Sequence, residues 1–394
     1  MRAPRAVVVL AGGALVATTA LSGCSTPSPG AIPGPVPLFT VKVPLSATFA
    51  TSTGVVAVVA MGTLSDPLNT FWQLFVRPDA TSRWTLVTPP GVADNGGLVA
   101  SPNEGASVLA GFEPSQALDF SPLALSRAEG ASWSPGLVPG ALAAVPDAVA
   151  VSSDGGFLAL VRADGGEVLR SAGRPTVWSK LVNRSTLASS PAGSSCGVGP
   201  LTAVALDATR GALMGTTCRS PGVVGIFQAA GGSWSRVGPR LSGLAASAPT
   251  QVLRLVDLNG TVGALVATGD RSSPSLIGVA STTDGTWARS APLSLATGGH
   301  IVSTGVESGG GFVVLASRPN GSMLLHLETG PGGGWKSLPA PPRGTATVAV
   351  EPGGVVAALA VATTRFTDWR LDVPTGTWSK VGSITVPIQS GSSS

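Results

Sequence analysis

Seven of the nine tryptophans recur along the chain at a nearly constant spacing and in one local context. Each follows a turn-rich segment and begins a short run typical of a β-strand, and consecutive members are 49, 45, 56, 53, 48 and 43 residues apart. A period of about 49 residues is typical of repeated multi-stranded units and is too long for a β-helix. The seven are Trp84, Trp133, Trp178, Trp234, Trp287, Trp335 and Trp378.

A second repeat runs in phase with the first. Each of these tryptophans is preceded, 23 to 30 residues earlier, by a glycine-bearing turn between two apolar segments. The segment after the turn is almost continuously apolar, as in residues 55–59, which indicates a strand buried on both faces. The turns centre on Gly54, Gly105, Gly155, Gly211, Gly260, Gly310 and Gly353.

One repeat can be read strand by strand. Residues 300–306, 311–317, 323–328 and 335–338 have strand character, and Asn320-Gly321 is a strong hairpin signal. Four antiparallel strands in about 40 residues form one blade of a β-propeller. The sequence therefore predicts an all-β fold, a seven-bladed β-propeller of four-stranded antiparallel blades over residues 38–390. A pair of β-sandwiches is the alternative, but it would need no such period.

Ring closure is left open between two possibilities. Residues 36–43 could pair with the last blade, or residues 378–386 could close the ring. We expect each repeated tryptophan to pack between adjacent sheets. Basic residues follow five of them and are interpreted as protection of the outermost strand from pairing with other chains, with a cationic rim as the alternative. They are Lys180, Arg236, Arg289, Lys336 and Lys380.

Composition excludes several other classes. The chain contains 53 glycines and 33 prolines, and only 11% of its residues are charged. A helical bundle tolerates little Gly or Pro, and a disordered chain has low hydrophobicity and high charge. Two histidines and three cysteines are too few for a four-ligand zinc framework, so we expect no metal site and no cofactor-binding site.

The amino-terminal segment has the pattern of an export signal. Arg2 and Arg5 precede an uncharged, mostly apolar stretch, residues 6–20, that is too short to span a bilayer. Leu21-Ser22-Gly23-Cys24 then resembles the bacterial lipobox. That resemblance implies that a signal peptide, residues 1–23, is removed and that Cys24 receives a diacylglycerol, the one covalent group expected. A plain secretory signal with a chance cysteine is the alternative.

The Pro-, Ser- and Gly-rich residues 24–37 are expected to form an extended tether, and residues 391–394 a disordered tail. Lipid anchoring would hold the protein on the extracytoplasmic face of the cell membrane. Without Arg2 and Arg5 the net charge falls from +4 to +2, and no block of like charge remains. Nucleic-acid binding is therefore not expected.

Cys196 and Cys218 flank the inner hairpin of the fourth repeat, so paired strands would bring them to the same end of that hairpin. Outside the cytoplasm a disulfide can persist, and we predict a structural disulfide between them. A metal or redox pair is the alternative, but the C-x-x-C spacing is absent.

Three segments, residues 152–156, 163–166 and 281–287, loosely resemble the Asp-boxes of sialidases, a structural motif of propeller hairpins. A retaining sialidase needs a tyrosine nucleophile, and this chain has no tyrosine. Ordinary glycosidases need two facing carboxylates, for which Asp368 with Asp372, or Asp66 with Asp79, are weak candidates expected to be solvated loop residues. His300 and His326 are interpreted as strand residues.

We therefore expect no catalytic residue. The predicted function is a membrane-anchored binding or scaffold lipoprotein, a monomeric ring that presents its loops to a protein or a cell-wall glycan. The alternative is a sialidase-like propeller hydrolase that uses paired carboxylates. A quinone- or metal-dependent propeller oxidoreductase ranks last, because the inner strands consist of Ala, Val and Gly rather than ligand residues.

Overall fold

The computed structural model divides the chain into two units, residues 1–34 and 35–394. All described residues belong to the second unit. The predicted signal peptide, Cys24, the tether and the tail lie outside the described residues. The structure describes residues 46–386 apart from 52, 63–69, 79–82, 90–96, 103–105, 113–119, 140–147, 153–154, 162–165, 208–210, 245–247, 259–260, 270–273, 283–284, 308–309, 331 and 352.

The strands form groups of consecutive antiparallel strands, which we number in chain order. Three of these groups are separate four-stranded sheets. The second strand group consists of β5 (Leu98–Pro102), β6 (Val108–Phe112), β7 (Phe120–Ser126) and β8 (Ser134–Pro139). The third consists of β9 (Ala148–Val151), β10 (Gly156–Val161), β11 (Glu167–Ala172) and β12 (Ser179–Asn183). The seventh consists of β26 (Thr345–Val350), β27 (Val356–Ala362), β28 (Arg365–Asp372) and β29 (Thr377–Thr385).

Two larger sheets each join two strand groups, which have four strands each except the fifth, which has five. In one, the parallel pairing of β1 with β22 links the first group, β1 (Ala47–Ala50), β2 (Val55–Gly62), β3 (Thr70–Arg77) and β4 (Thr85–Leu86), to the sixth group. The sixth group consists of β22 (His300–Val306), β23 (Phe312–Ser317), β24 (Met323–Glu328) and β25 (Trp335–Leu338).

In the other large sheet, β14 pairs with β17 and links the fourth and fifth groups. The fourth group consists of β13 (Val198–Asp207), β14 (Gly211–Cys218), β15 (Gly225–Ala230) and β16 (Ser233–Arg236). The fifth consists of β17 (Thr250–Leu258), β18 (Thr261–Gly269), β19 (Pro274–Ser281), β20 (Trp287–Arg289) and β21 (Leu293–Ser294).

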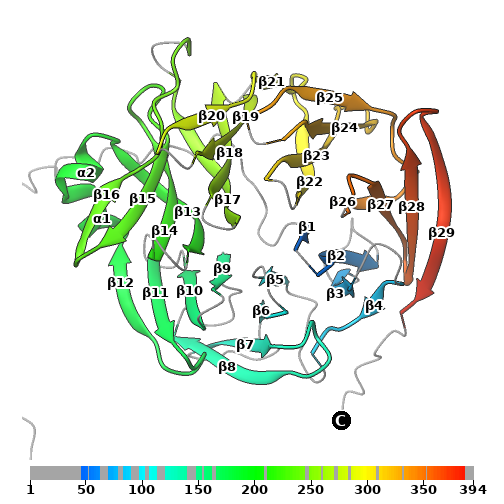
Figure 1. Cartoon of the computed structure of the whole chain (residues 1–394), viewed down its shortest axis with the longest axis horizontal. Coiled ribbons are helices and arrows are strands. Elements are labelled where there is room, and N and C mark those ends of the chain that lie inside the picture. The colour runs from blue at the N-terminus through cyan, green and yellow to red at the C-terminus, as the bar shows by residue number, and fades with distance from the viewer. Residues whose placement is uncertain are drawn as a thin grey trace, which may run out of the picture. The chain divides into compact units, whose positions relative to one another are not determined.

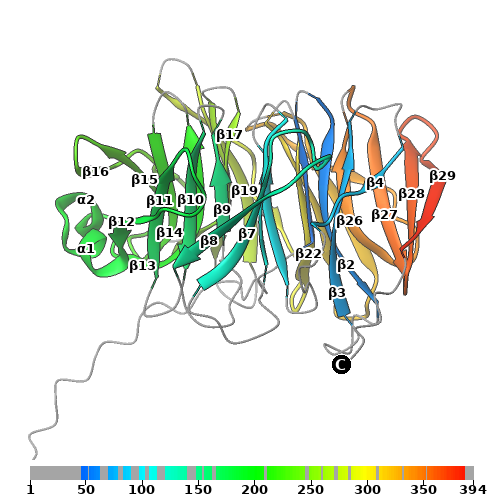
Figure 2. The same ribbon diagram turned by 90° about the horizontal axis from the view of Figure 1, so that it is seen from below.

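Within this unit the strand groups stand around a common centre (Figure 1), with their strands running roughly along the central axis (Figure 2). Burial falls from the inner to the outer strand of a group. In the seventh group every residue of β26 is buried, whereas β29 is exposed or half-buried along its whole length. The inner strands are rich in Val and Ala because neighbouring groups cover both of their faces.

The repeat that can be read from the sequence alone corresponds to the sixth group. β22, β24 and β25 have the predicted bounds, and β23 begins one residue later than predicted, at Phe312. Asn320-Gly321 lies in the turn between β23 and β24, where Gly321 has a positive φ of 79°. Local hairpin chemistry therefore locates this turn correctly.

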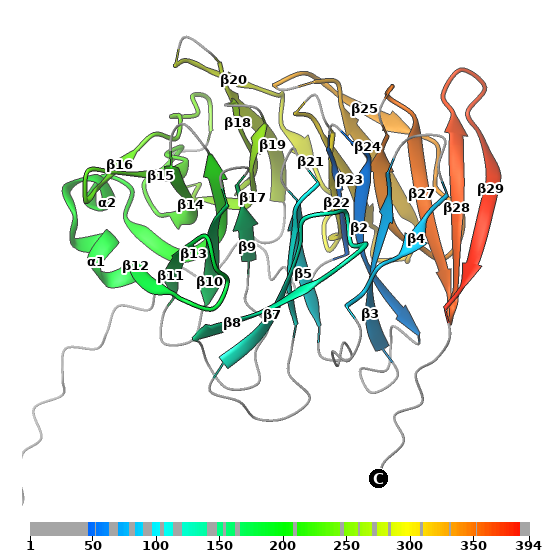
Figure 3. The same ribbon diagram turned by 60° about the horizontal axis from the view of Figure 1, so that its bottom comes forward.

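Two short helices were not predicted. α1 (Arg184–Ser189) and α2 (Pro191–Ser194) lie between the third and fourth groups and pack beside β12, β13 and β16 (Figure 3). Asn183 caps α1 by accepting a hydrogen bond from the Thr186 N–H at 2.8 Å. Among the described residues no helix is both long and apolar enough to cross a bilayer.

The buried apolar residues form clusters, and each cluster lies mainly between two consecutive strand groups. Residues of the first and second groups share one cluster, and the second and third groups share the next. The series continues through the later groups and returns to the start, because one cluster joins the seventh group to the first. Apolar packing therefore holds the strand groups together as a closed series.

The junction between the seventh and first groups closes this series. The rings of Phe75 and Phe366 stack there with their centroids 4.2 Å apart. The seventh group contains only consecutive strands, and β29 pairs with β28 alone. The closure predicted through residues 378–386 is thus not made by strand pairing with the first group, although Val386 packs in the shared cluster. Residues 36–43 lie outside the described residues.

Candidate functional site

Arg77 is a fully buried cation at the junction of the first and seventh groups. It is the last residue of β3, pairs with Val55 of β2, and its side chain has no solvent exposure. Arginine is almost never fully buried unless it is paired, so we expect carboxylate partners around its guanidinium.

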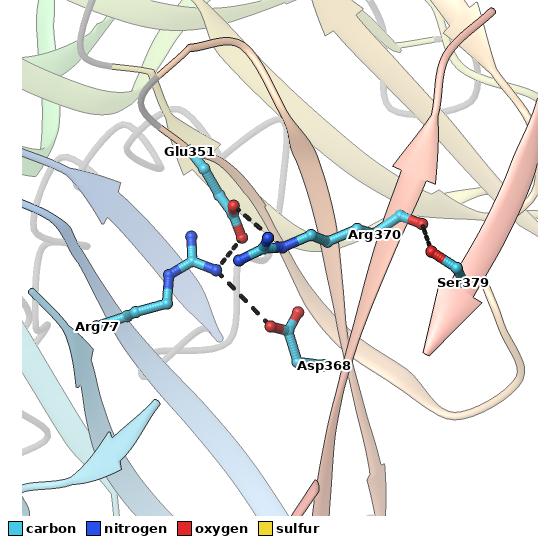
Figure 4. A network of polar contacts seen from close by, with 5 residues as sticks. All are labelled: Arg77, Glu351, Asp368, Arg370 and Ser379. Atoms are coloured by element: carbon cyan, nitrogen blue, oxygen red, sulfur yellow. Dashed lines mark hydrogen bonds and ion pairs between the residues drawn. The ribbon is translucent and has the colours of Figure 1, made fainter. Parts of the chain in front are cut away.

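Two carboxylates and a second arginine surround Arg77 (Figure 4). Arg77 Nη1 forms an ion pair with Glu351 Oε1 and lies 3.7 Å from Asp368 Oδ2. Arg370 Nε lies 3.4 Å from Glu351 Oε2. On the side of its own group, the Arg77 guanidinium lies 5.1 Å from the ring centroid of Trp84, a cation–π distance. We call Arg77, Glu351, Asp368 and Arg370 the clasp.

The charges of the clasp compensate one another. Burial raises the pKa of Glu351 and of Asp368, and the neighbouring Arg77 and Arg370 oppose that rise. Two cations and two carboxylates give the clasp no net charge when all four are ionised. Removing one partner would leave a buried charge uncompensated, so the clasp is built to hold the two groups together.

A second buried carboxylate lies at the junction of the fifth and sixth groups. Glu328, the last residue of β24, is 1% exposed. Its Oε2 accepts a hydrogen bond from the Phe312 N–H at 3.2 Å, and its Oε1 accepts one from the Gly332 N–H at 3.1 Å. Burial, opposed by these two hydrogen bonds and assisted by the nearby Glu307, raises the pKa of Glu328 to about 7. Burial also raises the pKa of Glu307.

The candidate pair Asp368 and Asp372 is not assembled. The expectation that Asp368 is a solvated loop residue is wrong, because it lies within β28, is buried and belongs to the clasp. Asp372 is exposed at the end of the same strand and accepts a hydrogen bond from the Thr375 hydroxyl at 2.6 Å. The other candidate pair, Asp66 and Asp79, lies outside the described residues.

Both histidines lie in strands. His300 bonds to the Ser317 hydroxyl through Nδ1 at 2.8 Å, and His326 Nδ1 lies 3.3 Å from the Ser337 hydroxyl. Burial, with a smaller contribution from Arg318, lowers the pKa of His326. Within the described ranges no three His, Cys, Asp or Glu side chains are grouped so that they could hold a metal ion.

The seven repeated tryptophans occupy equivalent places. Each lies at or next to the start of the fourth strand of its group and packs into the cluster shared with the preceding group. Two indole N–H groups also bond across the junction. Trp133 donates to the Val87 carbonyl at 2.9 Å, and Trp335 donates to Ser290 Oγ at 3.1 Å.

Cys196 and Cys218 form a disulfide with a Cα–Cα distance of 5.0 Å. It connects the end of the helical segment to the end of β14. Lys180, which follows the third repeated tryptophan, is exposed on β12 and forms an ion pair with Glu167 at 2.6 Å. The basic residues that follow the other four lie on outer strands too.

Sequence reasoning missed Arg77, Glu351 and Glu328. One signal was available for two of them, since Arg77 is the last residue of β3 and Glu351 directly follows β26, and both strands are otherwise uncharged. A charge at the end of an apolar run predicts either a solvated turn or a buried pair, and the sequence does not distinguish the two. Their sequence separation of more than 270 residues conceals the partner.

No protein-family model matches the sequence, and no curated protein matches it either. Solved structures do resemble the fold. A proposed 6-phosphogluconolactonase from Bacteroides uniformis aligns with a TM-score of 0.50 and 13% identity over 85% of this chain and 97% of its own. A protein from Lactobacillus plantarum aligns with a TM-score of 0.51 and 14% identity over 85% of this chain and 97% of its own. A puromycin-hydrolysing peptidase from Mycobacterium tuberculosis aligns with a TM-score of 0.51 and 13% identity over 89% of this chain and 55% of its own.

These likenesses show the fold. The chain is an all-β protein of four-stranded antiparallel sheets that resembles β-propeller structures. At such low identities the activities of these proteins do not transfer to this chain, because one propeller fold carries many unrelated functions. Function must therefore be argued from the side chains of this chain.

Proposed function

We propose that the protein is a seven-bladed β-propeller in which each strand group is one blade. The proposal is supported by the series of apolar clusters, each shared by two consecutive groups, which returns from the seventh group to the first. Class averages of single particles viewed along the ring axis would test it. Seven blades are expected, and six or eight would refute it.

We further propose that this propeller is a lipid-anchored binding or scaffold module on the extracytoplasmic face of the membrane. The observation that carries the binding role is the use of the buried charges. The clasp carboxylates pair with arginines, and Glu328 accepts two backbone hydrogen bonds. These groups hold the fold together, so function is left to the loops at the two ends of the ring.

The direction of β1 distinguishes those ends. β1 begins at the end where β2 finishes, so the described part of the chain starts at that end, and we call the opposite end the far end. The far end carries the turns between first and second strands and those between third and fourth strands. Arg127 and Arg174 are exposed in two of these turns. We propose that the partner, a protein or a cell-wall glycan, binds the far end.

The test is cross-linking in intact cells, followed by affinity capture of the full-length protein and mass spectrometry. The Cys24→Ala variant is the mislocalised control. We expect one stoichiometric partner that is captured with the anchored protein and lost with this variant. Capture that is unchanged by Cys24→Ala, or no specific partner at all, would refute the anchored scaffold.

Charge-reversal variants at the two ends provide matched controls. Arg127→Glu with Arg174→Glu alters the far end, and Arg318→Glu with Arg365→Glu alters the opposite end, where both arginines are exposed. We expect the first pair to reduce capture of the partner at least tenfold and the second pair to leave it unchanged. The reverse result would refute the far-end proposal and assign the partner to the end at which β1 begins.

A second candidate function is hydrolysis of a glycan, favoured by one observation. Glu328, with its pKa raised to about 7, lies near Glu307, and a protonated carboxyl beside a second carboxyl is typical of glycosidases. The 1% exposure of Glu328 ranks this candidate below binding. Release of reducing ends from purified cell-wall glycan by the wild type, but not by Glu307→Gln, would support hydrolysis. No release would eliminate it.

A further inference from the structure

Glu328 occupies a position that recurs in the strand groups. It is the residue at the end of the third strand, opposite the start of the second strand of its group. Ser126 occupies the same position in the second group, where it pairs with Val108, and Ser281 occupies it in the fifth. Arg77 is the equivalent residue of the first group. We call this position the turn slot.

The serines show what the turn slot does. Ser126 Oγ accepts a hydrogen bond at 2.8 Å from the N–H of Gly130, four residues later, and so holds the turn to the fourth strand. Ser281 Oγ accepts one at 2.9 Å from the N–H of Val262, at the start of the second strand. A neutral hydroxyl makes each of these hydrogen bonds, so neither depends on pH near neutrality.

Glu328 makes both kinds of hydrogen bond at once. Its Oε1 bonds to the N–H of Gly332, also four residues later, and its Oε2 bonds to the N–H of Phe312, at the start of the second strand. One carboxyl group thus fastens two turns. Its carboxyl also approaches the backbone of β19 so closely that a Cβ at Gly278 would overlap with both of its oxygens.

In the part of the chain that the structure describes, no cation forms an ion pair with this carboxyl. Among the described residues that face it, Glu307 from the turn between β22 and β23 is acidic, and Gly278 from β19 has no side chain. Arg289 of β20 directs its guanidinium to the Ser242 carbonyl, 2.8 Å away, and Lys336 of β25 is exposed. Arg77, by contrast, meets Asp368 of the neighbouring seventh group. Asp368 lies three residues before Leu371, the residue opposite the start of β27. Gly278 lies likewise three residues before Ser281, the turn-slot residue of the fifth group.

We propose that the junction between the fifth and sixth groups is a pH-sensitive joint, closed while Glu328 is protonated and loosened when Glu328 ionises. A carboxylate buried without a cation next to a second acid is unstable relative to its neutral form. The direction of the pKa shift agrees, because burial raises the pKa of Glu328 from an ordinary 4.5 to about 7. Stability contributed by the neutral form is complete below pH 4.5 and is lost as the pH rises through 7.

Hydrogen exchange on the full chain tests the proposal at single amides. We expect protection of the Phe312 and Gly332 amides, corrected for intrinsic exchange, to fall at least tenfold between pH 5.5 and pH 8. The Ala128 and Gly130 amides, which bond to Ser126, are the internal control and should keep their protection. Equal behaviour of the two pairs would overturn the proposal.

Two variants separate ionisation from packing. Glu328→Gln removes the charge and keeps one acceptor oxygen, so it can retain one of the two backbone hydrogen bonds, and it should abolish the pH dependence. Glu328→Ser gives the sixth group the serine that the second and fifth groups have at the turn slot. It should also abolish the pH dependence, and it serves as the test if the glutamine variant fails to fold. Persistence of the pH dependence in a folded variant would also overturn the proposal. Glu307→Gln should shift the transition to lower pH without removing it.

Discussion

Replacement of Arg77 by methionine is the sharpest test of the clasp. Methionine keeps the apolar length of the side chain but leaves Glu351 and Asp368 without their shared cation. Removing one partner of a buried ion pair costs about 3–5 kcal/mol, because the remaining charge stays desolvated. Loss of the contact with Trp84 adds about 0.5–2 kcal/mol. We therefore expect Arg77→Met to lower the free energy of unfolding by about 5 kcal/mol.

Urea unfolding followed by tryptophan fluorescence measures this change, and Trp84 is a local reporter. Arg127→Met is the matched control, since Arg127 is exposed near the same end of the second group, and it should change stability by less than about 0.5 kcal/mol. The deficit of Arg77→Met should shrink as the pH falls, because protonation of Glu351 or Asp368 removes the one carboxylate charge that Arg370 does not compensate.

A triple variant isolates the charges from the packing. Arg77→Met combined with Glu351→Gln and Asp368→Asn removes the cation and both of its carboxylates. It leaves only Arg370, whose side chain is 29% exposed and can be solvated. It should recover at least half of the stability lost in Arg77→Met alone, since replacing buried ion-paired groups together is often close to neutral. If Arg77→Met behaves like the Arg127 control, or if the triple variant is the least stable, the ion-pair argument is refuted.

Three further predictions concern other junctions. Replacing Cys196 and Cys218 by alanine should lower stability by about 3 kcal/mol, measured by urea unfolding against the wild type with and without reductant. Gly278→Ala should cost about 1–3 kcal/mol by overlap with the Glu328 carboxyl, and Glu328→Ser should rescue it; absence of rescue would contradict the close approach. Trp335→Phe should cost about 1 kcal/mol through loss of its hydrogen bond across the junction, whereas Trp335→Ala should cost about 3–5 kcal/mol.

Local patterns predicted the strands because each pattern depends on neighbouring residues. Residues 300–338 show this, since Asn320-Gly321 specifies a hairpin whatever the rest of the chain does. The two helices were missed because residues 184–194 contain no apolar periodicity. Their caps, Asn183 and Ser190, were the available signal.

The clasp could not be predicted in the same way. Arg77 and Glu351 meet only because the series of strand groups closes, and nothing near either residue in the sequence specifies the other. The sequence suggests a pair of Asp368 with Asp372 only because both are acidic and lie near predicted loops. Their strand register places Asp368 opposite Leu359, facing the junction, and Asp372 at the exposed end of β28.

The pairing of β1 with β22 has a consequence for the order in which the molecule assembles. β1 is among the first strands to be synthesised, yet Thr48 bonds to the carbonyl of Val348, 300 residues later, and Ala47 pairs with Thr304. Contacts of such long range form slowly. The edge of β1 therefore stays unpaired in an emerging chain until β22 is synthesised, so a nascent or truncated form would present that edge to chaperones and proteases.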